Sequence, residues 1–264
     1  MNGILAVNHF LKGEKYDTLH KHLATSAKKC GINLNIKTNL ELATQKAQAD
    51  FVLFWDKDIN LARRIEKSGV PVFNSAEAIE KCDDKGRTYI ELDGIVPQPK
   101  TLIAPKCYFK SDMSEFVEKA IDILTLPLIF KESFGSFGAQ VFLCNTKEEI
   151  YSHISEKPFI LQKFIIDSKG HDKFICAAER ENKNDFRSNV TNGGTMTPCN
   201  PTEKEIETAI KACETLGLTF GGVDILDDGS VCEVNSNAHI INIMNSTKID
   251  IAPYIFETIK EKIK

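Results

Sequence analysis

The sequence has 264 residues, of which 42% are hydrophobic and 27% are charged. This length suits two compact domains or one elaborate domain with a substantial core, and the composition excludes a wholly disordered chain. The formal net charge of −4 disfavours a protein that binds nucleic acid or an acidic membrane over its whole surface. We therefore expect neither a nucleic acid nor a membrane among its partners.

Targeting signals and cysteine spacing favour a protein of the cytoplasm. No apolar run approaches the length of a membrane span, and the N-terminus carries no basic region followed by an apolar stretch of signal-peptide length. None of the eight cysteines lies three residues from another, which excludes the spacing of zinc ribbons and thioredoxin-like sites. We interpret them as free thiols in a reducing compartment, and the alternative of a disulfide framework is disfavoured.

The first part of the chain alternates predicted strands with predicted helices. Apolar strand-like runs occur at 4–7, 32–36, 49–54 and 70–73. Helical spacing of apolar residues occurs at 16–27 and 59–67. Such alternation implies parallel strands joined by crossover helices. We predict a small parallel α/β domain at residues 1–75.

The rest of the chain has an α+β pattern. Predicted strands lie at 126–131, 139–143, 173–180, 219–226 and 230–235. A helix is predicted after Asp112, and two others begin at capping boxes. These boxes pair Thr146 with Glu149 and Thr202 with Glu205. The second of these helices is predicted to stop at Gly217.

The pattern that says most about chemistry is a predicted hairpin late in the chain. If Asp228-Gly229 forms a two-residue turn, Asp224 lies directly opposite Glu233, and Asn235 lies on the same face two residues further along. Two facing carboxylates repel one another unless a cation lies between them. Oxygen ligands suit Mg²⁺ that carries nucleotide phosphates better than they suit zinc. A solvated acidic hairpin is the alternative, because the same alternation describes any half-exposed strand.

A second pattern is a strand that ends at Lys131, followed by a loop with Gly135 and Gly138 and then another strand. Glycines let backbone amides approach phosphate oxygens, and a lysine at the strand end supplies positive charge. The Gly-Lys-Ser/Thr ending of a P-loop is missing, and the loop leads into a strand, unlike the dinucleotide fingerprint. Taken alone, a flexible hairpin explains the pattern equally well.

Arginine is scarce in this chain, and two of the five arginines, Arg180 and Arg187, lie near polar and glycine-rich segments. A guanidinium group offers a planar fork that matches phosphate or carboxylate oxygens. Solvated charges on a surface loop are the alternative.

The order of these segments resembles the ATP-grasp superfamily, and specifically the RimK-like amino-acid (α-L-glutamate) ligases. The segments that carry the resemblance are Cys82-Asp83-Asp84-Lys85, the Lys131 strand with its glycine loop, Gln162-Lys163-Phe164-Ile165, Gly170-His171-Asp172, Phe186-Arg187-Ser188-Asn189, Gly193-Gly194, Gly222-Val223-Asp224 and Glu233-Val234-Asn235. The likeness covers about residues 70–255. It implies a pre-ATP-grasp domain at 1–75 and a two-lobed ATP-grasp domain at 76–264, with a small lobe at about 100–162 and a large lobe at about 163–264.

This resemblance implies an ATP-dependent carboxylate–amine ligase. In such enzymes a carboxylate attacks the γ-phosphate of ATP to give an acylphosphate and ADP, and an amine then displaces phosphate to form an amide. The expected cofactors are ATP and Mg²⁺, with Mn²⁺ as an alternative ion. The expected partners are an amino acid such as glutamate and a peptide, protein or small-molecule carboxylate, and an assembly of identical chains is compatible with the sequence.

The resemblance also implies roles for individual residues. Nucleotide phosphates are expected near Lys85, Lys131, Gly135, Ser136 and Gly138. The adenine is expected against Gln162, Lys163, Phe164 and Ile165, the ribose near Asp172, and further nucleotide contacts at Arg187, Ser188 and Asn189. Arg180 and Arg187 are the expected catalytic residues, and Asp224, Glu233 and Asn235 are the expected metal ligands. Phosphoryl transfer depends on positioning and charge neutralisation, so the cysteines need no catalytic role.

Two places depart from the family's pattern. Part of a hairpin, including an arginine, is missing between Asp172 and Lys173. Because the predicted strand that follows would need a partner, we expect residues to have been omitted there, with a true deletion as the alternative. The second departure follows Asn235, where many ligases read Asn-x-Ser-Pro-Gly and this chain has His239 at the fifth position. Turn geometry and substrate choice near His239 therefore stay open.

Three other readings compete with a ligase. An ATP-binding module without turnover would not need the complete set of metal ligands that this chain has. A phosphotransferase could use the same site for the same first step. A Rossmann-type module is disfavoured, because no Gly-x-Gly-x-x-Gly opens a helix after the first predicted strand.

Overall fold

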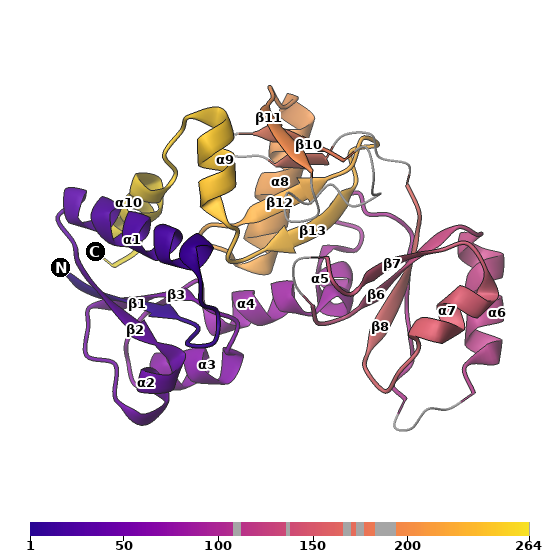
Figure 1. The fold of residues 1–264 in the computed structure, drawn as a ribbon, viewed down its shortest axis with the longest axis horizontal. Coiled ribbons are helices and arrows are strands. Elements are labelled where there is room, and N and C mark those ends of the chain that lie inside the picture. The colour runs from indigo at the N-terminus through magenta and orange to yellow at the C-terminus, as the bar shows by residue number, and fades with distance from the viewer. Residues whose placement is uncertain (108–111, 136–137, 166–169, 173–176, 183–193, 264) are drawn as a thin grey trace.

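The computed structural model describes residues 1–107, 112–135, 138–165, 170–172, 177–182 and 194–263, with the backbone alone at 170–172. Within these ranges the chain forms a parallel sheet followed by two antiparallel sheets with their helices (Figure 1). The predicted fold class, α/β followed by α+β, is confirmed. Among the helices that the structure describes, none is long and apolar enough to cross a membrane.

The N-terminal part forms a parallel four-stranded sheet. Its strands are β1 (Asn2–Val7), β2 (Asn33–Thr38), β3 (Phe51–Trp55) and β4 (Val72–Phe73), in the order β2-β1-β3-β4. The connecting helices are α1 (Glu14–Lys29), α2 (Asn39–Thr44) and α3 (Ile59–Lys67). All of β3 is buried, as a strand covered on both faces should be. The predicted crossover arrangement is therefore confirmed.

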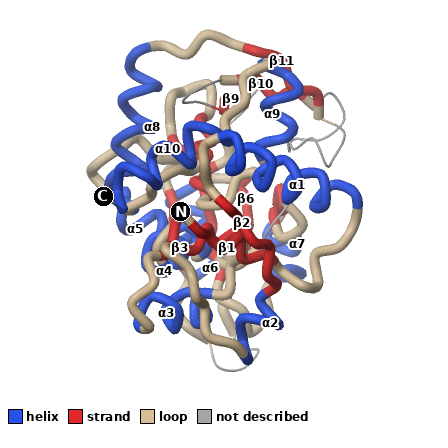
Figure 2. The backbone as a smooth tube through the Cα atoms, turned by 90° about the vertical axis from the view of Figure 1, so that its left-hand side faces the viewer, coloured by secondary structure: helices blue, strands red, loops and turns tan. Residues whose placement is uncertain are grey.

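The last helix, α10 (Ala252–Ile263), packs on the first sheet and not on the sheets that precede it in the chain. Figure 2 shows α10 beside α1, with the C-terminus close to the N-terminus. Phe256 and Ile259 of this helix share a buried core with Leu5 and Leu19. The C-terminal segment thus completes the core of the N-terminal sheet, and the division at residue 75 stays a prediction.

The second sheet is antiparallel and lies at the far end of the molecule from the first (Figure 1). Its strands are β5 (Thr101–Ile103), β6 (Leu128–Glu132), β7 (Val141–Cys144) and β8 (Phe159–Lys163), in the order β5-β8-β6-β7. Helices α6 (Ser114–Leu124) and α7 (Lys147–His153) share its apolar core. The Thr146 side chain accepts a hydrogen bond from Glu149 N, as predicted. The Glu149 carboxylate, however, accepts from Asn145 N at 2.6 Å, so the capping box is not closed.

The third sheet is also antiparallel. Its strands are β9 (Gly170–Asp172), β10 (Ala178–Glu181), β11 (Thr195–Pro198), β12 (Gly222–Ile225) and β13 (Val231–Asn235), in the order β11-β10-β9-β12-β13. Its helices are α8 (Glu203–Leu216) and α9 (Ile240–Thr247). The predicted capping box of α8 is present on Thr202 and Glu205, and the helix ends at Gly217 with φ 73°. Apolar side chains of α8 pack against β12 and β13.

The described part of the strand predicted at 173–180 does have partners. Ala178 to Arg180 pair with β9 on one side and β11 on the other. The expectation that this strand would lack a partner is therefore wrong for Ala178 to Arg180, while the omission of residues itself stays a prediction. Lys173, and with it the junction to Asp172, lies outside the described residues.

Two short helices, which the sequence patterns did not predict, connect the first sheet to the second. They are α4 (Ala76–Asp83) and α5 (Lys85–Leu92), capped by the side chains of Ser75 and Asp84. Arginines of α3 and α5 form ion pairs with Glu77 and Glu80 of α4. These pairs tie the start of α5 to the N-terminal sheet, and α5 begins at one of the predicted site residues.

Candidate active site

The structure confirms the predicted register of the late hairpin but not its predicted turn. Asp224 pairs directly with Glu233, and Gly222 pairs with Asn235. The loop is longer than two residues, because Gly229 N donates to Leu226 O at 2.8 Å and Leu226 N donates to Ser230 O at 2.9 Å. This loop alone would place Asp224 opposite Cys232. A bulge next to Asp224 shifts the register back by one residue and restores the carboxylate pair.

The same bulge interrupts the alternation of side chains along the hairpin. Val231 and Val234 both point into the core shared with α8, although they are three residues apart. Cys232 and Glu233 are less buried than these valines, and each contacts a lysine, Lys131 and Lys85 respectively. Strict alternation of side chains therefore fails at the bulge.

Each carboxylate of the hairpin meets a basic side chain. Arg180 of β10 places a guanidinium nitrogen 2.7 Å from Asp224 Oδ1. Lys85 of α5 places Nζ 3.7 Å from Glu233 Oε1. The backbone of β9 also sets Asp172 opposite Asp224, on the edge of β12 away from β13. Two expected metal ligands, the expected catalytic Arg180 and the expected phosphate contact Lys85 are thus gathered at one place.

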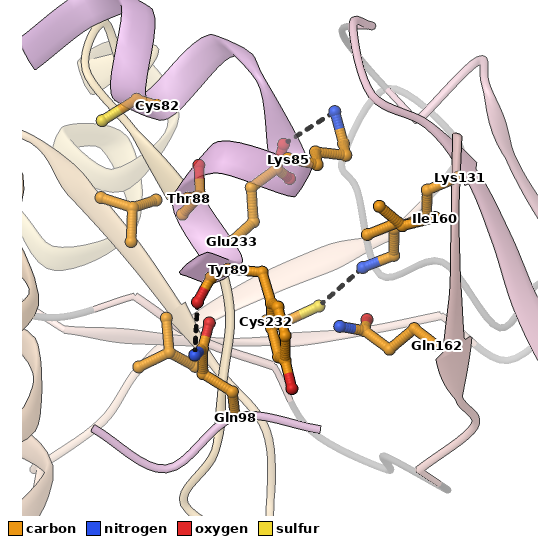
Figure 3. Close-up of a pocket in the computed structure, with 12 residues that line it drawn as sticks. Cys82, Lys85, Thr88, Tyr89, Gln98, Lys131, Ile160, Gln162, Cys232 and Glu233 are labelled. Atoms are coloured by element: carbon orange, nitrogen blue, oxygen red, sulfur yellow. Dashed lines mark hydrogen bonds and ion pairs between the residues drawn. The ribbon is translucent and has the colours of Figure 1, made fainter. Parts of the chain in front are cut away.

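A cleft lies beside this hairpin (Figure 3). Its walls come from α4, α5, β6, β8 and β13 together with the loop after α5. The lining side chains are Cys82, Lys85, Thr88, Tyr89, Gln98, Lys131, Ile160, Gln162, Val231, Cys232, Glu233 and Val234. A mixed lining with a few charged groups is typical of a site for a polar small molecule.

Lys131 enters the cleft from β6 and is only 6% exposed. Its Nζ lies 3.6 Å from Cys232 Sγ (Figure 3). Burial raises the pKa of the Cys232 thiol, and the lysine charge opposes that shift. The thiol is therefore neutral at physiological pH and does not balance the ammonium charge. Burying such a group is costly unless an anion balances it, which favours a bound phosphate.

Lys85 joins the glycine loop to the hairpin. Its Nζ donates to Gly135 O at 3.3 Å, in addition to its contact with Glu233. A Cβ atom at Gly135 would lie 2.5 Å from Gln140 Oε1, so a larger residue there would have to displace that flexible side chain. Gly138 has φ 70° and turns the chain toward β7. Ser136 lies outside the described residues.

Only part of the predicted adenine segment reaches the cleft. Gln162 is buried, and its Nε2 donates to Thr101 Oγ1 at 2.8 Å. Lys163 ends β8 with an exposed side chain, while its backbone N donates to Lys100 O at 2.8 Å. Phe164 and Ile165 follow β8 and are half-buried. The predicted nucleotide contacts Arg187, Ser188 and Asn189 lie outside the described residues.

Several lining residues were missed by the sequence patterns. Tyr89 and Thr88 come from α5, and Gln98 Nε2 donates to Tyr89 O at 3.1 Å. No motif singles them out, because one face of a short helix reaches the cleft only through its tertiary position. Cys232 could have been found from its place between the hairpin turn and Glu233, had the bulge been foreseen. Among the departures, His239 precedes α9, and burial lowers its pKa.

The donor set fits a magnesium ion. Asp224, Glu233 and Asn235 offer only oxygen donors, and both carboxylates already meet positive groups, so the position accommodates positive charge. In the part of the chain that the structure describes, no cluster of three or more His, Cys, Asp or Glu side chains could hold a metal by itself. A metal here would therefore share its coordination with ligand oxygens, as Mg²⁺ commonly does with phosphates.

Known proteins support the same interpretation. The model of the RimK-like ATP-grasp domain matches residues 85–259. The human beta-citrylglutamate synthase B is 32% identical over 250 residues, which span 84% of this chain but only 63% of that protein. A probable alpha-L-glutamate ligase of Maridesulfovibrio salexigens is 31% identical over 220 residues, spanning 76% of this chain and 71% of its own. The crystal structure of the D-cycloserine synthetase DcsG has a TM-score of 0.76 at 16% identity and covers 100% of both chains, which shows a shared fold.

Proposed function

Because the chain belongs to the RimK-like ATP-grasp family of amide-bond-forming ligases, we propose that it activates a carboxylate as an acylphosphate and joins it to an amine. The observation that carries this proposal is the meeting of opposite charges across one cleft. Lys131 and Lys85 supply positive charge, while Asp224 and Glu233 face one another on the hairpin. A nucleotide triphosphate with its divalent cation complements both sets.

The proposed reaction has two steps. An oxygen of the substrate carboxylate attacks the γ-phosphorus of ATP, the bond to the ADP oxygen breaks, and an acylphosphate forms. The amine nitrogen then attacks the acyl carbon, inorganic phosphate leaves, and the nitrogen loses a proton. Mg²⁺ held by Asp224, Glu233 and Asn235 would neutralise phosphate charge when it is bound.

The residues of this chain act by binding and charge neutralisation. Lys131 and Lys85 lie where they balance phosphate oxygens, and the backbone of the glycine loop lies next to Lys85. Arg180, beside Asp224, is the guanidinium that would contact the transferring phosphoryl group or the substrate carboxylate. The buried walls around Lys131 limit water near the acylphosphate, which would otherwise hydrolyse.

We propose glutamate as the amine substrate. The support comes from the names of the two relatives described above, a citrylglutamate synthase and a probable glutamate ligase. The carboxylate partner is a small molecule, a peptide or a protein C-terminus. The basic side chains near the hairpin suit a reaction in which both substrates carry carboxylates.

The test is to measure ADP formation with ATP, Mg²⁺ and a panel of paired carboxylates and amino acids. A ligase requires both partners and releases one phosphate for each amide formed. Adding hydroxylamine in place of the amine should trap an acylphosphate as a hydroxamate. ADP formation that depends on the carboxylate and gives a hydroxamate with hydroxylamine, but gives no amide with any amine, would instead identify a phosphotransferase. A chain that binds ATP without any turnover would be a binding module.

A further inference from the structure

A single side chain from the first sheet holds the two ends of the carboxylate hairpin. Asn74 follows β4 and is 0% exposed. Its Nδ2 donates to Phe220 O at 2.8 Å and to Ser236 O at 2.8 Å. Its Oδ1 accepts from Thr219 N at 2.7 Å and from Phe220 N at 3.3 Å. Both donors and the acceptor oxygen are thus used, and every partner is backbone of the segments that flank the hairpin.

These contacts lie where the hairpin's own ladder ends. The last paired residues are Gly222 and Asn235, and Phe220 and Ser236 lie just beyond them. At that point the Asn74 amide bridges the two strands in place of ladder hydrogen bonds. Ser236 directly follows the expected metal ligand Asn235, and β12 carries Asp224. The amide therefore sets the spacing of the chain segments from which two of the three ligands project.

Neighbouring contacts strengthen this hold. The ring of Trp55 stacks on Phe220 with centroids 5.7 Å apart and an interplanar angle of 11°. Asn237 Nδ2 donates to Asp56 O at 2.9 Å. A Cβ atom at Gly221 would lie 3.1 Å from Asn235 O, so the strands are already in close contact there. Residues at the ends of β3 and β4 thus contact the segments that continue both strands of the hairpin.

The same stretch of chain reaches the other part of the hairpin. After Asn74, helix α4 leads directly to α5, whose first residue, Lys85, lies 3.7 Å from Glu233. One continuous segment thus touches the hairpin both at its open end and at a metal ligand. The segment that follows β4 thus reaches the hairpin at two points, Asn74 and Lys85.

We propose that Asn74 is a positioning residue for divalent-cation binding, fixing the geometry of Asp224 and Asn235 through the backbone at both ends of the hairpin. The inference rests on the proposed function, because it assumes that these residues hold a metal. A buried amide with all its hydrogen bonds made is rigid, and groups that orient ligands without touching the metal control affinity. Removing this amide leaves the ligands in place but lets the strand ends separate.

The test compares Asn74→Ala and Asn74→Asp with the unmodified chain. Asn74→Asp keeps an acceptor for Thr219 N and Phe220 N but loses both donated bonds. Binding of Mn²⁺ with ADP is followed by electron paramagnetic resonance, and the Mg²⁺ dependence of ADP formation is measured in parallel. We expect the half-saturating cation concentration to rise by about tenfold to a hundredfold in both variants. The affinity for ATP at saturating Mg²⁺ should change much less.

Leu42→Ala is the matched control, because Leu42 of α2 is fully buried in the core on the other face of the first sheet. It should lower stability and leave the cation dependence unchanged. Half-saturation is a property of the folded molecules, so it can be measured even where only part of a preparation folds. Unchanged cation dependence in either folded Asn74 variant would overturn the inference, and so would an equal shift in Leu42→Ala. If the unmodified chain binds no Mn²⁺ with ADP, the proposed function itself fails.

Discussion

The two antiparallel sheets present opposite kinds of charge to the cleft. The second sheet contributes Lys131, a buried cation whose neighbour is the thiol of Cys232. The third sheet contributes Glu233, with Asp224 opposite it on the same hairpin, and each of these carboxylates is paired with a cation from another element. Among the described residues, no carboxylate lies within 4.0 Å of Lys131 Nζ, although Asp224 and Glu233 are close enough to raise the pKa of Cys232.

This difference shows which charges the protein balances by itself. Side chains neutralise the carboxylates that would otherwise repel one another, and those cations can be replaced by a metal. Lys131 is left for an external anion, because a neutral thiol cannot offset a buried ammonium. The cleft thus keeps a positive group ready on one sheet and a cation-binding pair on the other. This is what a metal-bound triphosphate requires on its two sides.

The largest expected effect comes from removing charge on the third sheet. Glu233→Gln keeps the shape of the side chain but weakens cation binding, so ADP formation should fall by about a hundredfold or more. Glu115→Gln is the control. Glu115 also pairs with a lysine, at 2.6 Å, but this pair lies on the exposed face of α6. It should keep full activity. A Glu233 variant with normal turnover would remove this residue from the metal site.

A slightly smaller effect is expected on the second sheet. Lys131→Met preserves side-chain volume and removes the ammonium, so ATP affinity measured by calorimetry should fall about tenfold to a hundredfold, since a hydrogen bond to a charged group contributes about 1.5–3 kcal/mol. Thermal stability should not fall, because the buried charge is lost. Lys157→Met serves as control, since Lys157 is exposed and pairs with Glu132. Equal ATP affinity in the two variants would contradict the role of Lys131.

These two charge sets differ in how far the sequence could predict them. The carboxylate pair follows from local pattern, because a turn and strand alternation place Asp224 opposite Glu233 within one hairpin. The prediction succeeded although the loop was longer than expected, since a bulge compensated for it. The partners Arg180 and Lys85 come from other elements, and their pairing with these carboxylates depends on packing that no local pattern encodes.

The fold, too, could be predicted only where local signals determine it. Helix periodicity and capping predicted α3 and α8 well, because such signals lie within a few residues of one another. The docking of α10 on the first sheet could not be predicted, since its apolar face fits any core. The role proposed for Asn74 could not be predicted either, because a lone asparagine after a strand looks like a turn residue. Its partners lie 145 to 162 residues later in the chain, and only the fold places them beside it.

A substitution at Cys232 can remove the difference in charge balance between the two antiparallel sheets. Cys232→Asp would give Lys131 an internal carboxylate partner and remove the difference between the two sheets. ATP affinity should then fall by about tenfold, or about 1.4 kcal/mol, because the lysine is no longer free to balance phosphate. Cys232→Ser changes the same atom without adding charge and should bind ATP nearly as well as the unmodified chain. Equal losses in both variants would mean that the thiol itself, and not the neutrality of the position, matters.

The smallest expected effect is a change in stability at Asp56. This residue tests whether a buried charge without a counter-ion destabilises the fold. It is 6% exposed, and its Oδ1 accepts hydrogen bonds from Asn8 Nδ2 and Lys57 N. Burial raises its pKa, and these hydrogen bonds only partly oppose the shift. A raised folded-state pKa means that the stabilising contribution is present while the carboxyl is protonated. That contribution is lost as pH rises through the folded-state pKa.

Asp56→Asn keeps an acceptor for both hydrogen bonds and removes the charge. The melting temperature at neutral pH should therefore rise by about 2–4 °C, and the difference should shrink as pH falls below the ordinary Asp pKa of about 3.9. Glu41→Gln provides the opposite sign, because hydrogen bonds from Thr38 lower the pKa of Glu41. That variant should be less stable than the unmodified chain at neutral pH and approach it in acid. If Asp56→Asn lowers the melting temperature at neutral pH, then the hydrogen bonds from Asn8 and Lys57 outweigh the cost of burying its charge.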